Sequence, residues 1–150
     1  MTRYEIRPTI IPDIQKLSKN LRSQDQEEIR KLGAKPRSAL MQGYLHGECY
    51  TGLFNKQVLT VFGVVPEGTS GRVWMLCSPE INSHLLTISR ESLKQIRHFS
   101  TQYKMLFNIV DEANDLTIRW LRGLGFQFGN TIPIGPEGHN FKEFYLCHSR

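Results

Sequence analysis

The sequence has no long apolar run. A helix that crosses a bilayer needs about 20 consecutive apolar residues, and no stretch of this 150-residue chain comes near that length. The first residues, MTRYEIRPTIIPDI, also lack the apolar core of a signal peptide. We therefore expect no membrane segment and no secretion by a signal peptide. This excludes integral membrane proteins and favours a protein that works in a cytoplasm.

Cysteine is scarce and poorly spaced for cross-links. The chain has three cysteines: Cys49, Cys77 and Cys147. Disulfide frameworks favour even numbers of cysteines and zinc sites favour closely spaced pairs, so neither kind of site is predicted. The histidines are scattered as well, without the spacing of metal ligands. We expect buried or half-buried free thiols in a reducing compartment, and no metal site.

Linkers, internal repeats and low-complexity segments are also missing. Neither the Gly-x-Ser-x-Gly elbow of hydrolases nor the Walker loop of nucleotide-binding proteins occurs. Hydrophobic residues make up 39% of the chain and charged residues 22%, which is the balance of an ordinary folded protein rather than a disordered one. We expect residues 1–150 to form a single domain with one core.

The first third of the chain predicts one strand followed by helices. The residues at 4–10, YEIRPTI, alternate as in a strand, and Pro8 suits a position where one backbone amide is not needed. Residues 12–21 place apolar side chains on one helical face, and residues 23–33 predict a second short helix that ends at a glycine. For residues 38–47 the sequence leaves helix and loop open, because two glycines interrupt the pattern.

From Glu48 onward the pattern changes to that of strands. Three runs of β-branched and aromatic residues, at 49–54, 58–65 and 72–77, are separated by turn-forming residues and predict an antiparallel meander. Residues 89–103 then predict a helix with one apolar face. The apolar run at 104–110 predicts a central strand that is covered on both faces.

The stretch ANDLTIRWLRGLGFQFG, at 113–129, predicts a helix with clear ends. Asn114 or Asp115 can accept the first amide hydrogens, and Gly125 can adopt the left-handed conformation that stops a helix. The apolar stripe of this helix is expected to comprise Thr117, Leu121 and Leu124, widened by Leu116 and Trp120. With a closing hairpin, QFGNTIPI to FKEFYLCH, the chain predicts an α/β sandwich with about six strands in one mixed sheet and helices on both faces.

This element order, closed by NDLTIRWLRGLGF, resembles the GNAT superfamily of acyl-CoA-dependent N-acyltransferases. The family's last helix carries a motif whose places are filled here by Asn114, Thr117, Ile118, Arg119, Gly125 and Phe126. The resemblance implies a mixed, largely antiparallel sheet with helices on both faces. It also implies acetyl-CoA as the cofactor, if the chain is an active enzyme.

Two features depart from the family. A glycine-rich loop should follow the fourth strand, because glycines let backbone amides approach a pyrophosphate. The chain has SPEINSHLLTISRES there instead, in which Pro79 lacks an amide hydrogen and Glu80 adds a negative charge. In addition, Leu121 occupies the place of a tyrosine that often serves the family as general acid, and leucine cannot transfer a proton.

What remains resembles a narrower group, the GNAT-like internal virion protein A of short-tailed bacteriophages. The matching features are the Asn-x-x-x-Ile-Arg-aromatic-Leu helix, Trp74 on the fourth strand, the missing glycine loop and the ending NFKEFYL. This resemblance implies a bacteriophage protein of the capsid-internal core, of DNA ejection or of assembly. Such a protein is found in the host cytoplasm or the phage virion and has virion or host proteins as partners.

Three functions therefore stay open. The first is a non-catalytic, virion-associated protein with a degenerate acyl-CoA site, for which no cofactor is expected. The second is an active acetyl-CoA-dependent N-acyltransferase that modifies a host protein or a small amine. The third is an inhibitor that docks on a bacterial protein.

The candidate site residues are few. Glu48 and Glu80 are the acidic residues nearest to the strands where a general base would lie, but the sequence favours structural or solvated carboxylates over that role. Asn114, Ser89 and Arg90 are the candidates for contacts to an acyl-CoA, with Asn114 also readable as a helix cap.

Basic residues recur on one face of the helix predicted at 89–103. Arg90, Lys94 and Arg97, together with His98, form this stripe, within a chain of net charge +5. The stripe is a candidate surface for coenzyme phosphates, for DNA or for an acidic partner protein, and a solvated helix face has the same pattern. A DNA contact through so few charges would be weak, sensitive to salt and blind to sequence.

Overall fold

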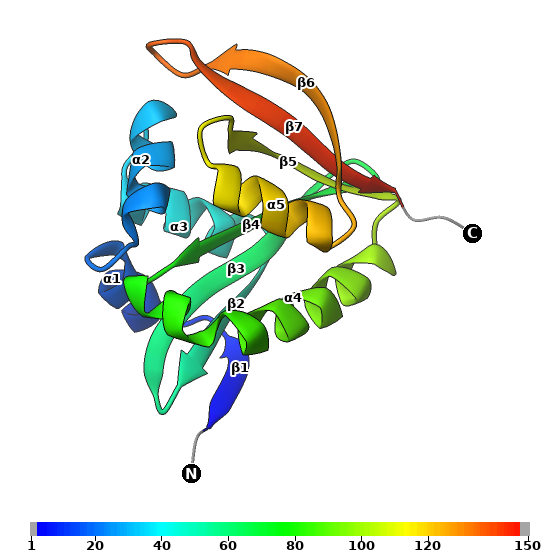
Figure 1. The fold of residues 1–150 in the computed structure, drawn as a ribbon. Helices are drawn as coiled ribbons and strands as arrows, with labels where there is room; N and C mark the ends of the chain where they lie inside the picture. The colour runs from blue at the N-terminus through cyan, green and yellow to red at the C-terminus, as the bar shows by residue number, and fades with distance from the viewer. Residues whose placement is uncertain (1–2, 148–150) are drawn as a thin grey trace.

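The computed structural model describes residues 3–147 and contains one seven-stranded sheet (Figure 1). Its strands are β1 (Tyr4–Pro8), β2 (Glu48–Phe54), β3 (Gln57–Glu67), β4 (Ser70–Cys77), β5 (Met105–Asp111), β6 (Gln127–Ile134) and β7 (His139–Cys147). Its helices are α1 (Ile11–Ser18), α2 (Ser23–Lys31), α3 (Pro36–His46), the short 3-10 helix η1 (Pro79–His84), α4 (Leu85–Ser100) and α5 (Asp115–Gly123).

The strands lie in the order β1-β2-β3-β4-β5-β7-β6. All neighbouring pairs are antiparallel except β4 and β5, which run in parallel. The predicted meander, the closing hairpin and the mixed, largely antiparallel sheet are therefore confirmed. The sheet has seven strands where about six were expected.

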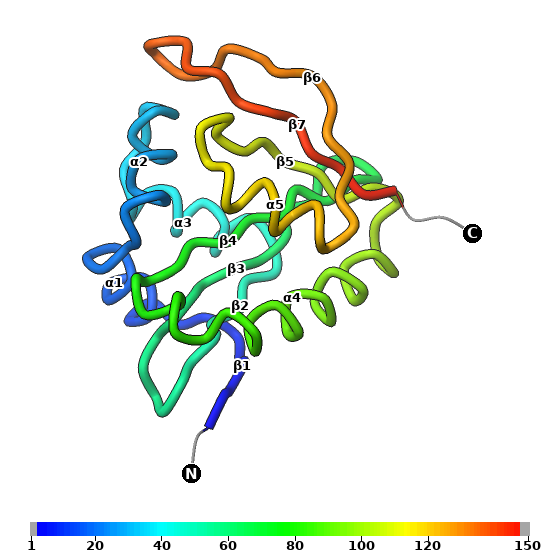
Figure 2. Tube along the Cα trace, viewed as in Figure 1, coloured from blue at the N-terminus to red at the C-terminus, as the bar shows by residue number. Residues whose placement is uncertain are grey.

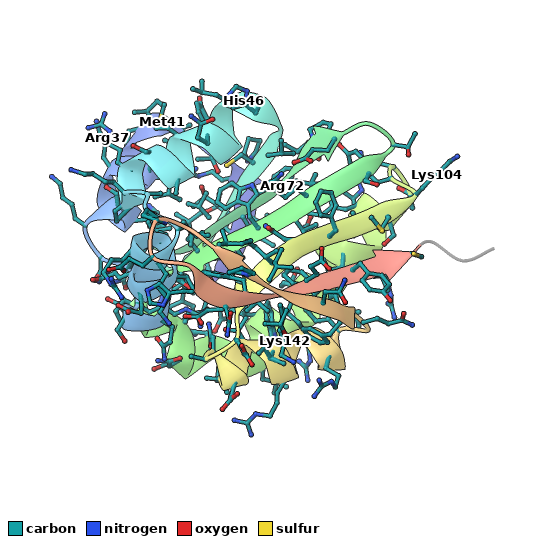
Figure 3. The ribbon with its side chains drawn as sticks, turned by 90° about the horizontal axis from the view of Figure 1, so that it is seen from above. Arg37, Met41, His46, Arg72, Lys104 and Lys142 are labelled. Carbon is teal, nitrogen blue, oxygen red and sulfur yellow. The ribbon has the colours of Figure 1, made fainter. Side chains whose placement is uncertain are left out.

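Helices cover both faces of the sheet and create two apolar layers. On one face, α1, α2 and α3 bury side chains such as Ile14, Ile29 and Leu40 against β2 and β3. On the other face, the buried side chains of α4 and α5, including Phe99 and Leu121, pack on β3, β4, β5 and β7. Viewed from above, α3, labelled at Arg37, Met41 and His46, lies on the opposite side of the sheet from α5 (Figure 3).

The segment that the sequence left open is helical. Helix α3 runs through Gly43, which is buried and lies directly against the indole ring of Trp74 on β4. Any side chain at this position would collide with the ring, so the glycine permits close packing rather than interrupting the helix. Helix α4 also begins earlier than predicted, at Leu85.

Three expectations about burial were wrong. Leu116 is 49% exposed, and the buried residues of α5 are Ile118 and Leu121, because the helix is rotated so that Ile118 faces the sheet. Cys147 is exposed near the end of β7, whereas Cys77 is buried and Cys49 half-buried. Strand β5 is fully covered on one face only, since Phe107 and Ile109 stay half-buried.

Within the described residues, no helix is both long and apolar enough to cross a bilayer.

Candidate functional site at the fork between β4 and β5

The two parallel strands in the middle of the sheet separate into a fork. Strands β4 and β5 pair only over three positions, from Ser70 with Met105 to Arg72 with Phe107. Beyond these pairs the strands diverge toward α2, as the ribbon and the Cα trace both show (Figures 1 and 2). A fork of this kind exposes backbone N–H and C=O groups, which need partners if they are buried.

The side chain of Asn108 bridges the base of the fork. Its amide nitrogen Nδ2 donates to the carbonyl of Val73 on β4 at 2.7 Å, while its oxygen Oδ1 accepts from the backbone N–H of Ile109 at 2.8 Å. At the point where the two strands separate, the Asn108 side chain thus provides a hydrogen bond in place of a backbone–backbone hydrogen bond between the strands.

Helix α2 closes the β4 side of the open end. Asp25 accepts the backbone N–H of Cys77 at 2.8 Å, and the backbone N–H of Arg22 donates to the carbonyl of the same cysteine at 2.9 Å. The neighbouring residue, Ser78, donates to Leu59 of β3 instead. The backbone groups of Cys77 that point away from β3 are therefore occupied by α2 and the residue before it.

The same helix closes the β5 side. Glu28 accepts the backbone N–H of Asp111 at 3.0 Å and the Nδ2 hydrogen of Asn114 at 3.3 Å. Lys31 adds an ion pair to the carboxylate of Asp111 at 2.7 Å. Helix α2 thus joins the ends of both strands through its own carboxylates, and we call the set Arg22, Asp25, Glu28 and Lys31 the α2 plug.

Burial changes the acid strength of the plug. It raises the pKa of Asp25, against the opposing influence of the Arg22 guanidinium at 3.0 Å. It also raises the pKa of Glu28, although hydrogen bonds from Asp111 and Asn114 act in the opposite direction. The plug therefore contains carboxyl groups that accept a proton more readily than solvent-exposed ones.

The nearby thiol is not a nucleophile. Burial raises the pKa of Cys77 to about 12, so the thiol stays protonated at neutral pH. A buried, protonated thiol is poorly suited to act as a nucleophile.

A cavity of about 1330 Å³ surrounds the fork and reaches both faces of the sheet. Its walls include apolar side chains of β4, β5, α4 and α5, among them Met75, Ile109 and Trp120. Trp120 also donates from Nε1 to Ser89 Oγ at 3.1 Å and so ties α5 to α4 beside the cavity. The space could receive an elongated ligand, but the strand ends beside it are already hydrogen-bonded within the chain.

The segment after β4 is the 3-10 helix η1 rather than an open loop. The backbone N–H of Ile81 donates to the carbonyl of Ser78 at 3.1 Å. Glu80 is hydrogen-bonded to its own backbone N–H, which lowers the pKa of its carboxyl group. The chain thus places a carboxylate, which also accepts from Asn20 and Gln57 at 3.4 Å, where the GNAT resemblance puts a pyrophosphate.

The two candidate bases do not come together. Glu80 lies 3.4 Å from the Gln57 side chain at the start of β3, whereas Glu48 pairs with Val64 near the end of that strand. Seven residues of strand separate these positions, which is about 23 Å. Glu48 accepts a hydrogen bond from Tyr50 at 2.6 Å, which raises the pKa of the tyrosine to about 12.

The three candidate cofactor contacts have different roles in the structure. Asn114 caps α5, because its side chain accepts the N–H of Thr117 at 3.3 Å, and this confirms the predicted cap. Ser89 accepts the Trp120 bond described above, while Arg90 is exposed on α4. Lys94 and Arg97 of the basic stripe are exposed too, and Lys94 lies 3.2 Å from Glu91.

Sequence reasoning missed the residues that close the fork. In the α2 plug, charged residues recur every third position and so share one helical face, a pattern that normally marks a solvent-exposed surface. Asn108 sits within an otherwise apolar strand, and this isolated amide was the one available signal. Among residues 3–147, no group of three or more His, Cys, Asp or Glu side chains is placed to hold a metal ion.

The architecture matches solved acetyltransferase structures. One is a spermidine N-acetyltransferase from Vibrio cholerae in complex with CoA and spermine, with a TM-score of 0.74 and 10% identity over 97% of this chain and 95% of that chain. Another is Ard1 from Thermoplasma volcanium, with a TM-score of 0.73 and 14% identity over 98% and 99% of the two chains. A third, from Bacillus anthracis, is an acetyltransferase of the GNAT family, with a TM-score of 0.73 and 9% identity over 99% and 96%.

The chain has the GNAT fold. The fold predicted from the element order and the last helix is thereby confirmed. No family model matches the sequence, and no curated protein matches it significantly. At identities this low, the similar structures establish the fold and not the activity.

Proposed function

We propose that this chain is a non-catalytic GNAT-fold protein of a short-tailed bacteriophage, used in the virion or in its assembly. The observation that carries the proposal is the α2 plug. Asp25 and Glu28 bind the backbone amides of Cys77 and Asp111, where the strands of the fork end.

The GNAT resemblance places a coenzyme in the groove between the fourth and fifth strands. A coenzyme that hydrogen-bonded to these strand ends would have to displace both carboxylates from their amides. Each displaced carboxylate would then face the negatively charged coenzyme from a half-buried position, which is unfavourable. The carboxylate of Glu80 adds a like charge where the pyrophosphate would lie. These three acidic groups all oppose coenzyme binding.

The residues around the groove support the same interpretation. Leu121 is buried in the core and cannot act as an acid toward a departing thiolate. The Trp120–Ser89 hydrogen bond joins α5 to α4 beside the cavity. Neither Leu121 nor the Trp120–Ser89 pair supplies a general acid for acyl transfer.

The proposal is tested by thermal unfolding with coenzyme A and acetyl-CoA at millimolar concentration. A ligand present at about 100 times its dissociation constant stabilises a protein by about 2.7 kcal/mol, so binding at useful affinity gives a clear shift in Tm. We expect no shift for this chain. An active GNAT enzyme measured in parallel serves as the positive control, and a saturable shift for the wild-type chain would refute the closed groove.

The virion assignment rests on the resemblance carried by the α5 motif, Trp74 and the ending NFKEFYL. Quantitative mass spectrometry of gradient-purified particles tests it. We expect the chain in a fixed copy number per particle, or in assembly intermediates of the capsid. Recovery only in complex with a host protein would instead support the inhibitor hypothesis.

A second function is favoured by the cavity and by Glu28. In an acetyl-CoA-dependent N-acyltransferase, a carboxylate with a raised pKa takes the proton from an amine as the amine attacks the thioester carbonyl and the thiolate leaves. Glu28 is the best-placed group for that role beside a cavity of about 1330 Å³. If the wild-type chain acetylated spermidine or peptide amines and Glu28→Gln abolished this activity, the chain would be an N-acyltransferase and the non-catalytic proposal would fail.

A further inference from the structure

The outer surface of α4 and α5 combines exposed leucines with exposed basic side chains. The two helices lie side by side on one face of the sheet, joined by the Ser89–Trp120 hydrogen bond (Figure 1). We propose that this surface docks on an anionic lipid surface. The proposal is independent of the function proposed above, because it uses residues that lie outside the fork.

Three exposed leucines lie in the first turns of the two helices. Leu116 precedes Trp120 by four residues, and Leu85 precedes Ser89 by four, so these two leucines share a helical face with the hydrogen-bonded pair. Leu86 follows Leu85 in the first turn of α4. Their exposed fractions are 48% for Leu85, 69% for Leu86 and 49% for Leu116. Exposed leucines that gather at one place mark an interaction site more strongly than scattered ones.

Basic side chains follow the leucines along both helices. Helix α4 exposes Arg90, Lys94 and Arg97, and helix α5 exposes Arg119 and Arg122. The acidic residues of the two helices are fewer: Glu91, which pairs with Lys94 at 3.2 Å, and Asp115. The two helices therefore carry a net positive charge in addition to their exposed leucines.

This combination favours a lipid surface over other partners. A second copy meeting the same surface across a two-fold axis would place five basic residues against five, which is repulsive. Nucleic acid would pair with the basic residues but would leave the leucines exposed to water. An anionic membrane satisfies both, since leucines enter the boundary of the acyl chains and arginines contact the headgroups.

Co-sedimentation with vesicles tests the proposal directly. The probes are vesicles of phosphatidylcholine alone and of phosphatidylcholine mixed with an equal amount of phosphatidylglycerol. We expect the full chain to bind the anionic vesicles, to bind neutral vesicles far more weakly, and to be released in part by high salt. Absence of binding to anionic vesicles at low salt would overturn the proposal.

Two pairs of matched variants locate the surface. Leu85→Ser combined with Leu86→Ser should weaken vesicle binding by about tenfold or more, because the exposed apolar area is lost. Leu45→Ser is the control, since Leu45 is 63% exposed on α3, across the sheet. Arg90→Gln with Arg119→Gln should also weaken binding by roughly tenfold or more, whereas Lys35→Gln with Arg37→Gln should not.

The leucine variants separate lipid from nucleic acid. The same proteins are titrated with a fluorescent DNA duplex. If the duplex bound more tightly than anionic vesicles, and the leucine variants left both interactions unchanged, the basic residues would form a nucleic-acid surface and the lipid proposal would fail. All substituted side chains are exposed, and an unchanged Tm confirms that each variant folds.

Discussion

Helices α2 and α5 are both nine residues long and both border the fork, yet different forces hold them. Helix α5 buries Ile118 and Leu121 in the main core and presents a capped start. Helix α2 buries Ile29 together with Asp25, and its hydrogen bonds to the ends of β4 and β5 are made by charged side chains.

The difference shows how the two helices serve the fold. Apolar packing holds α5 in place whether or not a ligand occupies the fork, because apolar contacts do not depend on a specific hydrogen-bonding partner. The polar bonds of α2 depend on the strand ends being free of other ligands. Helix α2 is therefore the element whose position reports whether the fork is closed.

The largest effect is expected at Asp25. Asp25→Ala leaves the half-buried Arg22 without its carboxylate and the Cys77 amide without its acceptor. We expect a loss of about 4 kcal/mol in the free energy of unfolding, measured by urea denaturation. Glu27→Ala, on the exposed face of the same helix, is the control and should change nothing measurable. Equal losses of stability for the two substitutions would mean that the contacts of the α2 plug do not stabilise the fold.

A somewhat smaller loss is expected in the apolar helix. Ile118→Ala removes a side chain that is only 7% exposed and should cost about 3 kcal/mol in the same assay. Leu116→Ala, in the same helix but 49% exposed, should cost far less. If Leu116 proved as important as Ile118, the rotation of α5 described here would be wrong.

Removing the Asn114–Glu28 hydrogen bond, which links α5 to α2, should reduce the free energy of unfolding by a smaller amount. Asn114→Ala removes the cap of α5 and the hydrogen bond to Glu28, with an expected loss of about 1 to 2 kcal/mol. In a double-mutant cycle, Asn114→Ala and Glu28→Ala should be non-additive, because each substitution removes the hydrogen bond between the two side chains. Strict additivity would mean that the bond contributes nothing.

The smallest expected effect is a change in how the free energy of unfolding depends on pH. Burial raises the pKa of Glu28, and a carboxyl group with a raised pKa stabilises the fold below its unfolded pKa and loses that contribution as pH rises through the folded pKa. The stability of the wild type relative to Glu28→Gln should therefore fall as pH rises from about 4 toward neutrality.

Asp13 provides the opposite case. Burial favours its neutral form, but hydrogen bonds from Arg7 and Ile10 outweigh this and lower its pKa. The stability of the wild type relative to Asp13→Asn should then fall as pH drops below the ordinary range of an aspartate. Urea denaturation across a pH series measures both differences in stability. If the two differences changed with pH in the same direction, the pKa shifts given for Glu28 and Asp13 would be contradicted.

Most of the fold could be predicted from the sequence, because it rests on apolar periodicity and turn residues. The meander, the closing hairpin and α5, with its Asn114 cap and Gly125 stop, follow from patterns of that kind. Helix α3 stayed open because the reason for Gly43 is the Trp74 ring, which is distant in sequence.

The site could not be predicted in the same way. A charged residue at every third position of a short helix suggests a solvent-exposed face, and only the divergence of β4 from β5 turns that face inward. Which amide Asp25 or Glu28 binds depends on tertiary contacts over more than 50 residues of chain. Glu48 and Glu80 attracted attention because they lie near strands, but the geometry separates them.

The closure of the fork is measured most directly by amide hydrogen exchange of the free chain, resolved for Cys77 and Asp111. If α2 closes the fork, both amides exchange at least about a hundredfold more slowly than exposed loop amides. Asp25→Ala should then accelerate exchange at Cys77, and Glu28→Ala should accelerate exchange at Asp111. Exchange of both wild-type amides at the rate of an exposed loop would contradict the closure of the fork, because the strand ends would then be open to a ligand.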